Sequence, residues 1–277
     1  MLDPSHDIGL LRMLQYGANV VLFGGLVVAM LAEWALPPPG YRWDLSRLAH
    51  GAHNLLLWLM GVAIMSIVFG TSVWLALFWL QSHGVGVLYL VHLPGWLHAI
   101  AAFALLDASD YIFHRLSHNV RWLWLLHAVH HSDPRVDVTT NLRQHPLHIL
   151  ITMAWKLVTC AAVGIPPWIF MLHEIVNLAF AHLHHAAISW PRWIDRALSW
   201  LIITPRLHWN HHSPATRSTN SNYGVIFSLW DRGFGTLTLP NAEPRPTFGL
   251  AAFDEARWHS VWGMLATPWR ARAIRQL

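Results

Sequence analysis

The sequence predicts an all-α protein whose helices form an integral membrane bundle. Hydrophobic residues make up 55% of the 277 residues and charged residues only 12%, whereas a typical soluble domain has about 25% charged residues. The mean hydropathy is +0.36, and a content of 18 tryptophans is typical of a protein with many side chains at membrane–water interfaces. Long apolar stretches predict about four transmembrane helices.

The first three apolar stretches are each long enough to cross a bilayer. Residues 19–36 end at a run of three prolines and approach the roughly 20 helical residues that span a hydrocarbon core of about 30 Å. Residues 54–80 exceed a straight crossing, which predicts a tilt or a bend near Gly70. A short turn at 81–84 leads to the third stretch, residues 85–106.

The fourth apolar region, residues 147–181, is interrupted at Gly164 and Pro166. Because each half is about one crossing long at most, we expect a re-entrant-like helical hairpin that enters and returns on one side of the membrane. The chain is then divided into N-terminal transmembrane helices at 1–106, a histidine-rich region at 107–240 that includes the hairpin, and a C-terminal cytosolic tail at 241–277.

Arginines set the predicted orientation. With three crossings before Asp107 and a hairpin after it, ten arginines fall on one face of the membrane: Arg42, Arg47, Arg115, Arg121, Arg135, Arg143, Arg192, Arg196, Arg206 and Arg217. The positive-inside rule makes that face cytoplasmic and places the N-terminus opposite. We expect no removable signal peptide, and alanine- and arginine-rich usage without an evident retrieval tail favours a bacterial inner membrane over the endoplasmic reticulum.

Fourteen of the 21 histidines fall between His114 and His212, mostly at helical spacing. "HRLSH" and "HLHH" each offer a pair on one helix face, and "HAVHH" and "HWNHH" each offer a triplet at i, i+3 and i+4. Imidazole is the commonest metal ligand, and this spacing aims several rings at one ion. The candidate ligands are His114, His118, His127, His130, His131, His182, His185, His208, His211 and His212.

Core packing is the alternative interpretation of each histidine. A single histidine on an apolar face is usually a core or interface residue, and we interpret His50, His53, His83, His92, His98 and His173 in this way. Two triplets and two pairs on the same predicted membrane face are hard to attribute to chance. Ten ligands exceed the four of a structural zinc site and suit two ions with about five ligands each.

Two acidic residues precede the first histidine pair on the same predicted helix face. An unpaired carboxylate at the end of an apolar span is costly, so we expect Asp107 to accept the outer N–H of a ligating imidazole and fix its tautomer. For Asp110 the same role and simple exposure to water at the helix end are equally open.

The donor set restricts the metal and its chemistry. Many neutral imidazoles without thiolates suit iron, zinc, copper or nickel. "HEIVN" at His173 lacks the second histidine of a zincin motif, which disfavours a zinc-dependent membrane hydrolase. A divalent-metal transporter would place its ligands at mid-membrane on broken helices, whereas these histidines lie beside arginines. Two irons that bind O₂ and attack an unactivated C–H bond of a lipid fit best.

The order of "HRLSH", "HAVHH" and "HWNHH" resembles the three histidine boxes of the fatty acid hydroxylase/sterol desaturase superfamily of integral membrane di-iron oxygenases. "DASDYIFHRLSH", "TTNLRQHP", "TPRLHWNHHS", "NYG" and "SLWDRGFGT" are similar to further elements of that family, so the resemblance covers about residues 100–240. Many relatives have an asparagine where this chain has Ala187, and the choice among His182, His184 and His185 as ligands stays open.

The resemblance implies a four-helix stalk under a cytosolic helical cap that holds two iron ions. It also implies hydroxylation or desaturation of a lipid with O₂ as co-substrate, and electrons from a separate carrier, a ferredoxin or cytochrome with its reductase. The basic face would dock an acidic carrier; its scattered charges suit lipid headgroups better than nucleic acid.

Three further residues are expected near the metals without being ligands. Pro146 restricts His145 to an extended conformation, which suits a loop lining the site. Asn222 and Asp231 are candidates for holding a ligand or structuring the cap.

Overall fold

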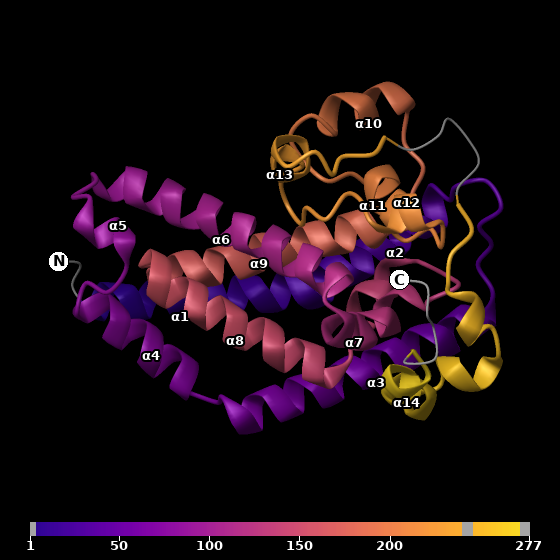
Figure 1. Ribbon diagram of the computed structural model, residues 1–277, viewed down its shortest axis with the longest axis horizontal. Helices are drawn as coiled ribbons and strands as arrows, with labels where there is room; N and C mark the ends of the chain where they lie inside the picture. Colours follow the sequence, from indigo (N-terminus) through magenta and orange to yellow (C-terminus); the bar gives the residue numbers. More distant parts are fainter. Residues whose placement is uncertain (1–3, 240–245, 272–277) are drawn as a thin grey trace.

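The computed structural model describes residues 4–239 and 246–271, and within these ranges the protein is built from helices (Figure 1). The predicted all-α class is confirmed, since the pairing of Ile202 with Phe227 is an isolated antiparallel bridge. In chain order the helices are α1 (Pro4–Asn19), η1 (Val20–Gly25), α2 (Leu26–Ala35), α3 (Leu45–Val68), α4 (Ser72–Ser82), α5 (Val87–Leu90), α6 (Gly95–Asn119), α7 (Arg121–His131), η2 (Val138–Leu142), α8 (Pro146–Val163), α9 (Pro167–His185), α10 (Arg192–Leu198), α11 (Pro205–His211), α12 (Thr216–Thr219), α13 (Leu229–Gly233), η3 (Ala251–Phe253), η4 (Ala256–His259) and α14 (Val261–Ala271).

The protein is an integral membrane helical bundle. Large apolar side chains on its outer surface, such as Val28, Leu31 and Ile67, are exposed, as lipid-facing residues are expected to be. Five helical segments of the described residues are long and apolar enough to cross a membrane: Gly9–Ala35, Leu45–Val68, Ser72–Leu90, Gly95–Asn119 and Pro146–Val163.

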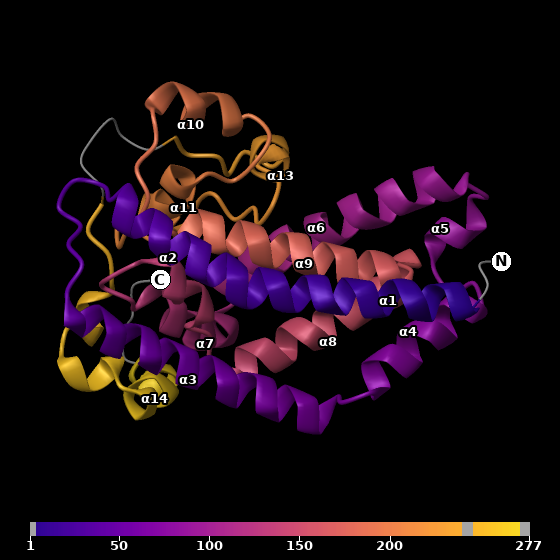
Figure 2. The same ribbon diagram turned by 180° about the vertical axis from the view of Figure 1, so that it is seen from behind.

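A break at Gly70 explains why five candidate spans replace the expected four or so. The predicted stretch 54–80 is divided between α3 and α4, and Gly70 between them has φ +46°, a conformation that glycine adopts at little cost. Figures 1 and 2 show α3 and α4 following one another along the bundle with a bend between them.

Helices α8 and α9 form the predicted hairpin. Pro146 and Pro167 lie in their first turns, where the missing N–H of proline has no intrahelical acceptor to lose. Gly164 ends α8 with φ +87°, and a Cβ there would lie 2.8 Å from the ring of Tyr89. The hairpin starts and returns at the end of the bundle that carries α7, and its tip lies near α5 (Figure 1).

Helix α1 begins at the end of the bundle opposite α7, α11 and α14 (Figures 1 and 2). The membrane half is filled by an apolar cluster that includes Leu77, Leu106 and Cys160, so Cys160 is a packing residue. At the other end, Met264 of α14 packs against Leu57 and Val129. The described part of the C-terminal segment is therefore packed on the bundle at this end.

Candidate metal centre

Five histidines from three helices form a first cluster at the end of the bundle that carries α7. They are His114 and His118 of α6, His127 and His131 of α7, and His211 of α11. One ring nitrogen of each lies within 4.8 Å of those of all the others. The rings are close enough to share one ion.

Four histidines form a second cluster: His130, His185, His208 and His212. The Nε2 atom of His185 lies 3.1 Å from Nε2 of His130 and 2.9 Å from Nε2 of His208. The Nε2 atoms of His208 and His212 are 3.1 Å apart. The two clusters adjoin, because the ring of His212 stacks on that of His131 with centroids 4.6 Å apart.

Helical geometry divides each predicted triplet between the two clusters. In α7, the i and i+4 members belong to the first cluster and the i+3 member to the second; in the α11 triplet the assignment is reversed. On a helix, residue i+4 lies closer in direction to residue i than residue i+3 does. Each triplet therefore serves both clusters, which accounts for its recurrence in the sequence.

The strongest indication of a cation lies between His114 and His211. Nδ1 of His114 lies 2.8 Å from the carbonyl oxygen of Tyr223, and Nδ1 of His211 lies 2.7 Å from that of Ser221. Since a carbonyl oxygen can only accept, each Nδ1 carries the proton and each Nε2 presents a lone pair. These two Nε2 atoms are 3.1 Å apart, the separation of two ligands about 2.1 Å from one ion at an angle of about 95°. A metal ion there removes the repulsion between the lone pairs.

Burial keeps these imidazoles neutral. Desolvation lowers the pKa values of His127, His131, His208 and His212 well below the usual range, and neighbouring histidines lower them further. Neither ring nitrogen of His127, nor Nε2 of His131, has a hydrogen-bond partner within the described residues. Buried polar groups in proteins almost always have partners, and the neutral imidazole is the form that binds metal. The donor set therefore fits a metal centre.

The segment 221–238 holds the carbonyl acceptors of the first cluster. Asp231 accepts the backbone N–H groups of Tyr223 at 2.8 Å and Gly224 at 2.7 Å, one on each carboxylate oxygen. Asn222, with φ +53°, donates to two backbone carbonyls at 3.0 and 2.8 Å. Both residues fix the backbone that orients the ligating rings rather than contacting the rings themselves.

Asp107 has partners other than the ligating imidazole that we expected. Its carboxylate accepts the indole N–H of Trp230 at 2.7 Å and the backbone N–H groups of Ile226 and Phe227, each at 3.3 Å. These donors come from the segment that also carries Asp231. The oxygens of Asp107 are thus occupied by backbone and indole groups at some distance from the clustered rings.

Asp110 belongs to a buried ionic group and does not face water. Its Oδ2 lies 3.1 Å from Nζ of Lys156, which also pairs with Glu174, and accepts a bond from Asn177 at 2.9 Å. Asp110, His173 and Glu174 are close enough to hold a cation, but the ammonium of Lys156 already supplies positive charge there. We assign no metal to this group.

Two predicted residues lie outside both clusters. His145 caps α8, where its Nδ1 accepts the N–H of Leu147 at 3.2 Å. His182 lies with Nδ1 3.3 Å from the amide nitrogen of Asn141 and with its ring against Gly25. The face of α9 that carries His182 is turned toward η1 and η2, so the structure does not bring this ring to the other candidate ligands.

Two histidines that the sequence reasoning did not select lie beside the clusters. The ring of His148 is 4.9 Å from that of His127, and its Nε2 lies 3.2 Å from the hydroxyl of Ser117. The ring of His184 is 4.0 Å from that of His208. The i, i+3 spacing of His148 from His145 was the available signal for the first of these. His184 was one of the three alternatives left open.

A polar network fixes the C-terminal end of α7, which carries His130 and His131. Arg143 is fully buried. It donates from Nε to the carbonyl of Val129 at 2.9 Å and from Nη2 to the hydroxyl of Ser132 at 3.0 Å. These two contacts bracket His130 and His131, so the guanidinium holds the backbone on both sides of two candidate ligands.

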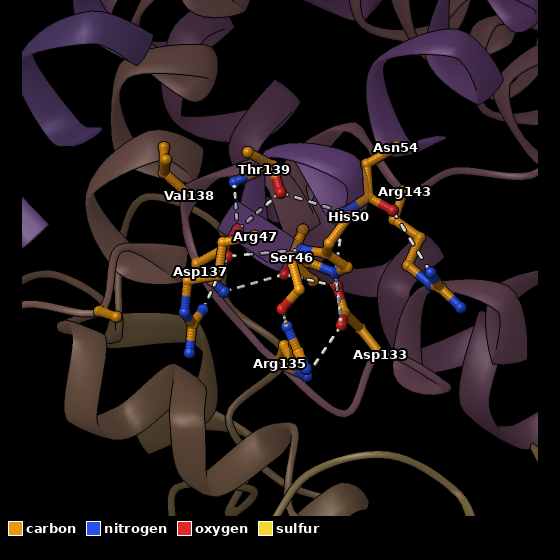
Figure 3. Close-up of polar contacts among 12 residues, drawn as sticks. Ser46, Arg47, His50, Asn54, Asp133, Arg135, Asp137, Val138, Thr139 and Arg143 are labelled. Carbon is orange, nitrogen blue, oxygen red and sulfur yellow. Dashed lines mark hydrogen bonds and ion pairs between the residues drawn. The ribbon is translucent and has the colours of Figure 1, made fainter. Parts of the chain in front are cut away.

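Helix α3 completes this network, and Figure 3 shows the part that joins His50 and Asn54 of α3 to Asp133 and Arg143. Asn54 accepts a bond from Nη1 of Arg143 at 3.3 Å. Nε2 of His50 lies 2.9 Å from Oδ1 of the buried Asp133, just beyond the end of α7. His50 is therefore an interface residue, as its isolated position in the sequence indicated.

Replacing Arg143 with lysine is expected to weaken metal binding about tenfold or more, the usual cost of losing a group that orients a ligand. Lysine keeps the charge but lacks the guanidinium fork that bonds both sides of His130 and His131. Chelator competition on monodisperse protein in detergent measures the change. Arg135→Lys, in the same loop and exposed, is the matched control. Equal affinities for the two variants would contradict the expectation.

Asp231→Asn is expected to release the metal of the first cluster and retain that of the second. The amide has one acceptor oxygen, so its NH₂ would face the N–H of Tyr223 or Gly224 and loosen the carbonyl that orients His114. Metal analysis of the purified variant should give about half the wild-type content. Asp195→Asn, at a carboxylate that accepts the indole N–H of Trp190 at 3.1 Å, should leave the content unchanged; full metal in Asp231→Asn would refute the role.

Both histidine clusters lie in the part of the chain that is similar to known proteins. The fatty acid hydroxylase family model matches residues 99–236, the part of the chain that contains both clusters. Alkylglycerol monooxygenase of Xenopus tropicalis is 34% identical over 146 residues, which are 52% of this chain and 31% of the relative. The ornithine lipid hydroxylase OlsE of Rhizobium tropici is 33% identical over 154 residues, 56% of this chain and 45% of the relative.

A more distant relative is the dihydroceramide fatty acyl 2-hydroxylase FAH2 of Arabidopsis thaliana, 27% identical over 153 residues that make up 50% of this chain and 60% of the relative. The chain thus spans about a third to three fifths of the length of these relatives. No solved structure matches it. Through residues 99–236 and the histidine segments within them, the chain belongs to the fatty acid hydroxylase/sterol desaturase superfamily.

Proposed function

We propose that the protein is a membrane-bound di-iron oxygenase that uses O₂ and external electrons to hydroxylate a C–H bond of a lipid, with desaturation as the alternative outcome. The facing lone pairs of His114 and His211, 3.1 Å apart within a first cluster that adjoins a second, are the observation that carries the proposal. The names of the relatives refer to alkylglycerol, ornithine lipid and dihydroceramide fatty acyl groups. A long hydrocarbon chain on a polar lipid is therefore the substrate class that we propose.

The proposed ligands are the nine clustered histidines, within the catalytic region 107–240. His184 is the candidate for a fifth ligand of the second ion, because its ring lies beside His208 whereas that of His182 does not. When bound, two irons would supply the activation of O₂ for attack on an unactivated C–H bond. In balance, O₂, two electrons and two protons convert a C–H bond to C–OH and release one water.

The residues of the chain have three tasks in this reaction. The carbonyls of Ser221 and Tyr223 hold Nδ1 protons and so aim Nε2 atoms at the first ion. The fully buried Arg143 holds the α7 ligands in register. Burial of both clusters excludes bulk water, which would otherwise compete with a hydrocarbon substrate.

The position of the clusters favours this function over metal transport. Three clustered histidines lie on α7 and three in the α11 triplet, outside the five candidate spans, and the others lie near the ends of α6 and α9. A transporter is expected to bind its ion near mid-membrane. We propose that this end is cytoplasmic, in a bacterial inner membrane or the endoplasmic reticulum, and that a separate ferredoxin or cytochrome delivers electrons there.

Metal analysis tests the centre directly. Purified protein is expected to hold about two iron atoms per chain, one for each cluster, and His130→Ala and His211→Ala should each reduce the content. His83→Ala is the control, because His83 is exposed and bonded to the carbonyl of Trp79 far from the clusters. One zinc per chain in place of iron would rule out the oxygenase.

Isotope labelling tests the reaction. Cells that express the chain under ¹⁸O₂ should accumulate lipids heavier by one ¹⁸O atom, and cells that express His211→Ala should not. Mass spectrometry of extracted lipids measures both. A chain that binds two irons but changes no lipid, or that incorporates oxygen from water instead, would contradict the proposed reaction and leave the metal centre intact.

A further inference from the structure

The segment 223–236 follows one face of the membrane-spanning helix α6. Its contacts on α6 recur every three or four residues, as one helix face requires. They pair Phe227 with Phe103 (ring centroids 6.4 Å apart), Trp230 with Asp107, Phe234 with Tyr111 (stacked rings, 5.3 Å) and the Tyr223 carbonyl with His114. From Phe103 to His114 this face extends about 16 Å along the helix axis. The segment thus runs from the metal clusters toward the middle of the bilayer.

The depth of this contact follows from the length of α6. The candidate span covers Gly95–Asn119. At 1.5 Å per residue, Phe103 lies about 24 Å along the axis from Asn119, the end of α6 near the histidine clusters. A hydrocarbon core of about 30 Å that starts near Gly95 therefore includes Phe103 and Asp107. Figures 1 and 2 agree, because both show α13 beside the middle of the long axis of the bundle rather than beyond its end.

Several backbone N–H groups of this region are bonded within the protein, as irregular backbone in lipid requires. The N–H of Ile203 donates to the carbonyl of Ile226, and the N–H of Ser228 donates to the carbonyl of Leu201, both at 3.0 Å. Asp107 accepts two further N–H groups of the same loop. Irregular backbone that faced water would not need a buried carboxylate for this purpose.

The outer surface of this region is apolar and exposed. Trp200 is 65% exposed, Leu201 53%, Leu229 46% and Phe234 56%. These four side chains, here called the apolar patch, come from two segments that adjoin at the Ser228–Leu201 backbone bond. Such a group on a water-facing surface is unusual unless something covers it. Arg196 is also exposed, and the guanidinium of Arg232 stacks 4.2 Å over the ring of Trp200. Tryptophan and arginine together are the residues that anchor proteins at the level of lipid phosphates.

We propose that residues 193–203 and 224–236, here called the shoulder, insert into the bilayer leaflet on the side of the metal clusters and contact lipid directly. The occupant of the apolar patch is bilayer lipid, because the patch continues the lipid-facing surface of α6 at the same depth. The inference concerns lipid contact and stands whether or not the chain is an oxygenase.

Site-directed labelling tests the shoulder in the full chain. On a Cys160→Ala background, single cysteines at Leu201 and Leu229 are labelled with the fluorophore NBD, and the protein is reconstituted in phosphatidylcholine nanodiscs. Both positions are exposed, so the substitutions leave packing intact. Val28→Cys, on the outer face of a candidate span, is the lipid control, and Glu255→Cys, an exposed charged position, is the water control.

Labels at 201 and 229 are expected to behave like the label at 28: quenched by doxyl groups on the lipid acyl chains and protected from aqueous iodide. Iodide quenching as strong as at 255, without doxyl quenching, would overturn the proposal. Protection from both quenchers in particles that hold two chains would also overturn it, because a second copy of the chain would then cover the patch.

Discussion

The structure depends on one constraint: nine imidazole rings, eight of them buried, are packed together, and several of their nitrogens meet other nitrogens in place of hydrogen-bond acceptors. A buried polar group without a partner costs about 1–3 kcal/mol, so a handful of them is comparable with the 5–15 kcal/mol that stabilises a typical domain. A bound cation would convert these costs into ligand bonds. Metal binding would therefore be coupled to the stability of this end of the bundle, as it is in metal-dependent folds generally.

The chain meets this constraint with backbone groups more than with side chains. Carbonyls of Ala181, Ser221 and Tyr223 accept the outer N–H of three clustered rings, a role often filled by carboxylates. A carbonyl adds no charge, so ions held by these rings would keep more of their positive charge. This arrangement requires a rigid loop. Asp231 and Asn222 supply the rigidity through their hydrogen bonds to backbone groups.

Local rules were enough to predict the helices and most of the clustered histidines. Proline and glycine at 164–167 end one helix and start the next, and Gly70 divides a stretch that was too long for one crossing. Helical spacing selected ten histidines, and the structure brings nine of them together. Such features depend on neighbours within about one turn, and a sequence records them directly.

Contacts between distant segments could not be predicted in the same way. The division of each triplet between two clusters depends on how α7 and α11 cross, and the position of His182 depends on the packing of α9 against η1 and η2. The role of Arg143 required the knowledge that α3, 89 residues earlier in the chain, lies beside it. Its full burial is a property of the assembled fold.

Asp107 illustrates how the surroundings of a carboxylate decide whether it needs a hydrogen-bond partner. At the end of a helix in water, a carboxylate can be solvated and needs no partner. In lipid, both the carboxylate and an irregular backbone are costly, and each can satisfy the other. The bonds from Ile226, Phe227 and Trp230 to Asp107 therefore allow a loop to lie against α6 below the level of the metal clusters. The same loop then supplies the carbonyl that accepts the Nδ1 proton of His114. Asp107 would thus act on the proposed metal centre through the backbone of this loop.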